Sequence, residues 1–291
     1  MSLKIKTSDH YLPEKRYIID VLFNVFLGVD YHIEIVSNPK ETKVILENEN
    51  SLVLEDHFFS LYQDAYLTKE AIPSGVSYLS ETPGLDQNLP VLYGRDFFAW
   101  KTENGKQKAI LGPDILAGSF FMLTRWEEYV LPDRDEHQRF PASSGLIYKY
   151  NLLTRPVVNE YAELIKKILQ NLGFDNAFRE RRFQMVPTHD VDHLFYPFPS
   201  VRSLLSNFFR GKFKTLTRHI QSAVSKNPYN TFSYLMDISE KYGVQSRFYF
   251  MSAAADILDK GKKKQKEELL SILKEIQARG HIIGFHPGYG T

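Results

Sequence analysis

The N-terminal part of the chain mixes the hydrophobic patterns of helices and strands. Apolar residues recur at intervals of three and four in residues 15–27 and 159–172, so each segment is predicted to form an amphipathic helix. Residues 31–36 and 43–46 alternate apolar and polar positions, as half-buried strands do. Asp114 precedes a further helical pattern and is predicted to cap it. This part is therefore expected to be an α+β module.

From Phe183 onward the pattern changes to alternating strands and helices. We predict strands at 183–188, 246–251 and 281–285, helical pieces within 201–241, and a helix at 262–279. This alternation predicts parallel strands with helical crossovers, hence an α/β sheet or barrel. The boundary is placed so that residues 1–180 form one domain and residues 181–291 the next. In parallel sheets, functional groups gather at the carboxyl ends of the strands.

One such end carries the sequence Thr-His-Asp-Val-Asp-His, residues 188–193. In an extended segment Asp190 and Asp192 point to one side, while His189 and His193 point to the other. Two carboxylates this close repel unless a cation lies between them or one takes a proton, so one could bind metal while the other acts as a base. Alternatively, an aspartate at a strand end caps the next turn, and the two histidines serve in packing or support.

A second strand end carries His286, five residues after His281. Because their odd spacing places these histidines on opposite faces of a strand, only one can easily join the aspartates. His286, at the carboxyl end, is the better predicted ligand. We interpret His281 as a structural histidine held by hydrogen bonds.

Composition narrows the range of functions. With 43% apolar and 24% charged residues, the chain is typical of a globular protein. A net charge of +1 gives no overall attraction to nucleic acid, and we expect no such partner. The absence of cysteine means that a metal must be held by His, Asp or Glu. The N-terminus lacks the apolar core of a signal peptide, and the apolar stretch 17–29 is too short to span a membrane, so we expect a cytoplasmic protein without membrane insertion.

Residues 188–193 and 280–290 resemble the first two active-site motifs of the polysaccharide deacetylase superfamily, the carbohydrate esterase family 4-like enzymes. Those motifs read Thr-Phe-Asp-Asp-Gly and Gly-His-Glu-Ile-Gly-Asn-His-Thr-Xaa-Xaa-His. The resemblance implies that Asp190 is the catalytic base and that Asp192 and His286 bind the metal. Gly290 stands where the family has its second metal-binding histidine. Residues that could substitute as a ligand or support one are His189, His193 and His281.

The resemblance further implies a function. The chain would be a metal-dependent hydrolase that uses a divalent ion, most simply zinc, to remove acetyl groups from an N- or O-acetylated polysaccharide or saccharide precursor. Residues 183–291 would form the opening half of a deacetylase-like (β/α) barrel, with the remaining motifs expected after Thr291. Residues 116–158 resemble a module found ahead of some bacterial deacetylase-like domains. The alternative is a non-catalytic carbohydrate-binding or scaffold protein with a degenerate site, which Gly290 favours.

Overall fold

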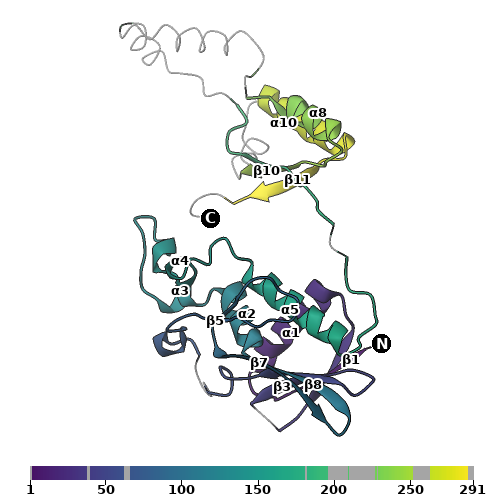
Figure 1. The fold of residues 1–291 in the computed structure, drawn as a ribbon. Helices are drawn as coiled ribbons and strands as arrows, with labels where there is room; N and C mark the ends of the chain where they lie inside the picture. The colour runs from purple at the N-terminus through teal and green to yellow at the C-terminus, as the bar shows by residue number, and fades with distance from the viewer. Residues whose placement is uncertain are drawn as a thin grey trace. The chain divides into compact units, whose positions relative to one another are not determined.

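A computed structural model describes residues 2–37, 40–61, 66–180, 182–195, 209, 227, 229–251 and 263–287. The chain divides into two compact units, Met1–Arg181 and Arg182–Thr291 (Figure 1). Each unit has a sheet and a hydrophobic core of its own. The protein is therefore a mixed α/β protein with more than one sheet, as the sequence predicted at this level.

The first unit is built on a six-stranded mixed sheet in the order β2-β1-β3-β4-β8-β7. Its strands are β1 (Leu3–Thr7), β2 (Tyr31–Ile35), β3 (Glu41–Ile45), β4 (Ser51–Glu55), β7 (Gly94–Glu103) and β8 (Lys106–Pro113). The short strands β5 (Ser77–Leu79) and β6 (Leu89–Val91) form a separate antiparallel pair. In β1, Leu3 and Ile5 are buried, whereas Lys4 and Lys6 lie on the other face and form ion pairs with Glu34. One face of the sheet is thus apolar and the other is charged.

Helices cover the apolar face, where Figure 1 shows α1, α2 and α5 on one side of the sheet. The helices of this unit are α1 (Leu12–Ile19), the π-helix η1 (Asp20–Leu27), the 3-10 helix η2 (Lys69–Ala71), α2 (Ile115–Thr124), α3 (Glu127–Val130), the 3-10 helix η3 (Ala142–Ser144), α4 (Leu146–Lys149) and α5 (Val157–Asn171). The helices predicted at 15–27 and 159–172 are confirmed, the first as α1 continued by η1. Asp114 is the predicted cap, because its Oδ1 accepts a hydrogen bond from Ala117 N at 2.9 Å.

The second unit has a parallel three-stranded sheet in the order β11-β10-β9. Its strands are β9 (Thr188–Val191), β10 (Arg247–Met251) and β11 (Ile282–His286), and its described helices are α8 (Phe232–Lys241) and α10 (Lys263–Ala278). Both helices lie on one side of β10 and β11 in Figure 1. Phe248, Met236 and Ile276 are fully buried between the two layers. The strands form an open sheet within the part of the chain that the structure describes, so the (β/α) barrel remains a prediction.

The strand predicted at 183–188 is wrong in position, because β9 covers Thr188–Val191 instead. The partner strand β10 begins at Arg247, whose N–H donates to the carbonyl of Pro187, and Gly243 turns the chain shortly before β10 with a φ of 65°. No described strand therefore extends far enough to pair with residues 183–186, and Phe183 stays 89% exposed. Of the helices predicted within 201–241, α8 is described, and residues 201–208 and 210–226 lie outside the described part.

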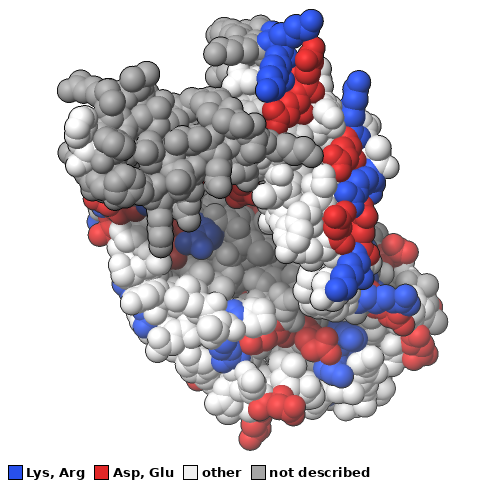
Figure 2. Space-filling view, turned by 90° about the horizontal axis from the view of Figure 1, so that it is seen from above, with Lys and Arg blue, Asp and Glu red and all other residues white. Residues whose placement is uncertain are grey.

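Surface charge is mixed in sign. Figure 2 shows acidic and basic side chains interspersed over the described part of the face it draws. In the second unit, Arg279 forms ion pairs with Asp237 and Glu240 of α8 at 2.6 and 2.7 Å. None of the helices within the described ranges is both long and apolar enough to cross a membrane.

Candidate functional site

The second unit brings Asp190 and His286 together from two strands that are not neighbours. Tyr249 of β10 pairs with Asp190 on one side and with Gly284 on the other, so these residues lie at one level of the sheet. His286 follows Gly284 by two positions and therefore shares its face. Its Nε2 lies 3.4 Å from Oδ2 of Asp190. The pair lies at the carboxyl end of a parallel sheet, where such folds place their ligands.

Asp192 and His193 lie beyond the end of β9. The strand ends at Val191, so the strict alternation that predicted two parallel carboxylates does not extend to Asp192. Asp192, His193 and Asp190 all line a cavity of about 500 Å³. The rest of its wall is made by His189, Val191, Tyr229, Thr231, Phe232, Leu235 and Phe248. Carboxylates and an apolar wall thus face the same space, although no ion pair joins Asp192 to His286 among the residues described.

His189 lies on the buried face of the sheet. Its ring stacks on Phe248, with centroids 4.8 Å apart, and its Nε2 lies 3.3 Å from Oγ of Ser246. Burial, together with the nearby charge of His281, lowers the pKa of His189 below its ordinary value. A neutral imidazole in this position supports β9 against β10.

His281 lies at the amino-terminal start of β11, at the other end of the strand from His286. Its Nδ1 accepts a hydrogen bond from Ser246 N at 3.0 Å, and its Nε2 lies 3.3 Å from Oε1 of Glu240. Hydrogen bonds from Arg279 and then from His281 lower the pKa of Glu240 to about 2. His281 therefore ties β11 to α8, and it is remote from the Asp190–His286 pair.

The donor atoms of Asp190 and His286 can be compared with the ligand geometry that a metal ion requires. Nδ1 of His286 is buried and has no hydrogen-bond partner among the described residues. Two tetrahedral zinc ligands, each about 2.0–2.1 Å from the ion, lie roughly 3.3 Å from each other. The 3.4 Å between Nε2 of His286 and Oδ2 of Asp190 fits that separation. In the described ranges no three His, Asp or Glu side chains are arranged so that they could hold a metal ion together, and Gly290 lies outside those ranges.

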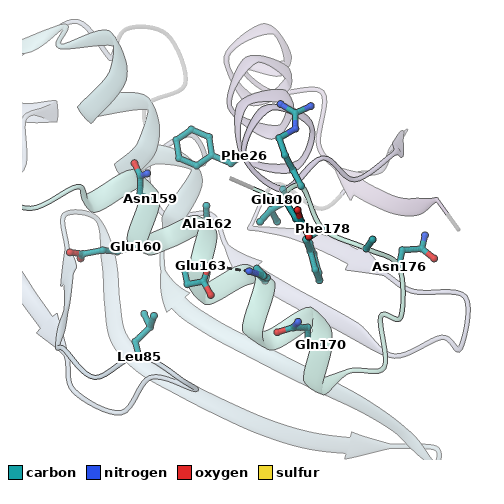
Figure 3. A pocket seen from close by; sticks show the side chains of 14 residues that line it. Phe26, Leu85, Asn159, Glu160, Ala162, Glu163, Gln170, Asn176, Phe178 and Glu180 are labelled. Atoms are coloured by element: carbon teal, nitrogen blue, oxygen red, sulfur yellow. Dashed lines mark ion pairs between the residues drawn. The ribbon is translucent and has the colours of Figure 1, made fainter. Parts of the chain in front are cut away.

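The first unit contains a groove of about 800 Å³ along α5, which the sequence patterns did not predict. In Figure 3, Leu85 and Glu160 flank one side of α5, and Phe178 and Asn176 lie on the other. Glu163 forms an ion pair with Lys166 at 3.6 Å, and Nζ of Lys166 lies 5.8 Å from the Phe178 ring centroid. The contact between Lys166 and Phe178 joins the segment after α5 to the helix, which gives this groove a structural explanation.

A buried polar cluster lies at the carboxyl ends of β1, β4 and β8. Nζ of Lys15 is 2.6 Å from Oδ2 of Asp56 and donates to Oγ of Ser8 at 2.8 Å. Asp114 accepts hydrogen bonds from the backbone N–H groups of His57, Phe58 and Ala117. Burial and the charge of Asp56 raise the pKa of Asp114 to about 6. The cluster joins three loops that follow separate strands.

Comparison with known families identifies the first unit. Residues 3–173 match the family model of DUF7033, a family of unknown function. Because the match spans more than half of the chain, the protein belongs to the DUF7033 family. No curated protein and no solved structure matches the chain.

Proposed function

We propose that this chain carries part of a metal-dependent hydrolase site that removes acetyl groups from N- or O-acetylated saccharides. The observation that supports it most is the approach of His286 to Asp190 within 3.4 Å, from strands separated by β10. These residues belong to the two segments that resemble polysaccharide deacetylase motifs. The proposal therefore rests on a resemblance in sequence and on a contact in space between two of the residues that the resemblance names.

His286 and an aspartate are the residues that would hold the ion. An imidazole nitrogen and a carboxylate oxygen are ligands that zinc accepts, and such catalytic sites have three protein ligands. Asp192, which lines the same cavity as Asp190, is the expected further ligand. When bound, the ion lowers the pKa of a water molecule and polarises the acetyl carbonyl.

The chain's own residues supply the remaining chemistry. An aspartate that does not bind the ion accepts the proton of the attacking water, which is the role that the motif gives to Asp190. The cavity of about 500 Å³ has space for a sugar residue beside the carboxylates. Phe232 and Phe248 form the aromatic part of its wall.

The two aspartates have different expected roles, and these can be separated by experiment. We expect the unmodified chain to bind zinc. The substitutions Asp192→Asn and His286→Ala should each abolish zinc binding. Asp190→Asn should retain it. If Asp190→Asn loses zinc and Asp192→Asn keeps it, the two roles are exchanged, as the contact with His286 would allow. His189→Phe is the matched control, because it keeps a ring against Phe248 and should leave zinc binding unchanged. Zinc content is measured by mass spectrometry after dialysis.

Turnover is tested separately, as release of acetate from N-acetylglucosamine oligomers. The base variant should keep the metal and lose acetate release, whereas ligand variants should lose both. A chain that binds neither zinc, cobalt nor nickel would contradict the enzyme proposal. If that metal-free chain still bound the oligomers, the non-catalytic carbohydrate-binding protein, which Gly290 favours, would replace it.

A further inference from the structure

The first unit exposes an aromatic ring that the core does not explain. Trp100 on β7 is 44% exposed. It pairs across the hairpin with Ala109, and Phe98 pairs with Leu111, so these side chains share the sheet face on which Ala109 and Leu111 are fully buried. The Phe98 ring meets the indole edge-on, with centroids 5.2 Å apart and an interplanar angle of 86°. The indole is thus held in one orientation, with part of its surface open to solvent.

Polar, uncharged side chains stand beside this ring. Thr102 and Gln107 form the next cross-strand pair on the same face, and Asn171 is the last residue of α5. Together with Lys101 they line a cavity of about 450 Å³ at Trp100. Its volume lies within the range of about 300–1,000 Å³ that is usual for small-molecule sites.

The walls of the cavity are held in position by two asparagine side chains. Asn50 accepts a hydrogen bond from Gln107 N through Oδ1 at 2.8 Å and donates through Nδ2 to the carbonyl of Leu172 at 2.9 Å. Asn48 donates to the same carbonyl at 2.8 Å. The hairpin that carries Trp100 is therefore tied to the helix end that carries Asn171. A site whose walls are held in advance loses less entropy when a ligand binds.

We propose that the Trp100 cavity binds an uncharged saccharide. The flat apolar face of a pyranose ring complements the exposed indole, and its hydroxyl groups complement the amide and hydroxyl side chains of Gln107, Asn171 and Thr102. The cavity lies wholly within the first unit, so this goes beyond the proposed function and does not require the Asp190–His286 pair. It gives the DUF7033 unit a role in holding a glycan chain.

Binding of N-acetylglucosamine oligomers to the 291-residue chain tests the proposal, with a chelator present so that no metal site contributes. Calorimetry should give saturable binding, weakened about tenfold or more by Trp100→Ala and less by Trp100→Phe. Gln107→Ala and Asn171→Ala should each weaken it severalfold. Tyr129→Ala is the control, because Tyr129 is 78% exposed elsewhere and should leave affinity unchanged. Circular dichroism checks that each variant is folded.

Fluorescence gives a second readout, because Trp126 is only 5% exposed and the oligomer should change the emission of Trp100 alone. Absence of saturable binding, or equal affinity of Trp100→Ala and the unmodified chain, overturns the proposal. The proposal is also overturned if the chain does not bind the oligomer but binds an extended peptide, which could pair with β7 because β7 is an edge strand. Acetate release measures the proposed hydrolase activity separately. The saccharide-binding proposal and the hydrolase proposal can therefore fail independently.

Discussion

The ring of Tyr249 lies across Gly284, its partner on β11, so closely that a Cβ atom at residue 284 would come within 2.5 Å of Cδ1 of the ring. Asp190 is the partner of Tyr249 on the opposite side. The ring of Tyr249 therefore leans toward β11 and away from Asp190. His286, two residues after Gly284 on β11, contacts Asp190. A glycine at this position is a steric requirement of the candidate site.

Substitution of Gly284 by alanine should consequently weaken metal binding. The added methyl group forces the Tyr249 ring back toward Asp190 and disturbs the approach of His286. We expect zinc affinity to fall about tenfold to a hundredfold, as for residues that support metal ligands. Calorimetric titration with zinc measures the change. The double variant Gly284→Ala/Tyr249→Ala removes the clash and should recover most of the affinity; if it does not, the ring is not the cause.

Much of the first unit could be predicted from local patterns. The period of the apolar residues located the helices, and Asp114 was recognisable as a cap because N-caps depend on a few consecutive residues. The position of β9 was not predictable in this way. Where a strand begins depends on which partner is beside it, and β10 lies about sixty residues further along the chain.

The candidate site illustrates the same limit. The sequence could indicate Asp190 and His286 as chemically suitable groups at two strand ends. It could not show that the carboxylate of Asp190 contacts His286, because the register of β9, β10 and β11 decides which residues share a level. Trp100 was missed because its exposure depends on where α5 ends, which no pattern around residue 100 records.

The buried ion pair of Lys15 and Asp56 should contribute strongly to the integrity of the first unit. Both side chains are almost fully buried, with 1% and 3% exposure. Lys15→Met leaves an uncompensated carboxylate in the interior and should lower the unfolding free energy by about 3–5 kcal/mol. Chemical denaturation measures this loss, and Lys15→Met/Asp56→Leu should recover part of it. Lys4→Met, at an exposed pair with Glu34, should change the unfolding free energy far less.

Asp114 should make stability depend on pH. Its pKa is raised from 3.8 to about 6 in the folded protein, so the folded state binds the proton more tightly than the unfolded state does. This contribution to the unfolding free energy is fully present below about pH 4 and is lost as the pH rises to about 6. Asp114→Asn cannot titrate, although it also loses an acceptor for backbone N–H groups. The stability advantage of the unmodified chain over this variant should therefore shrink between pH 4 and pH 6 in thermal melts; an advantage that grows would contradict the raised pKa.

Asn50 should couple stability to the proposed saccharide site. Asn50→Ala removes the hydrogen bonds to Gln107 N and to the carbonyl of Leu172, and we expect the unfolding free energy to fall by about 1–2 kcal/mol. Because the hairpin is then released from the end of α5, oligosaccharide affinity should fall as well. Asn48→Ala is the matched control, since the Asn48 side chain donates to the same carbonyl and accepts a hydrogen bond from Asn50 N at 3.0 Å, but does not bond to Gln107. It should lower stability by a similar amount, because it also removes two hydrogen bonds, and it should preserve affinity. Equal losses of affinity in the two variants would show that the link from Asn50 to Gln107 does not shape the cavity.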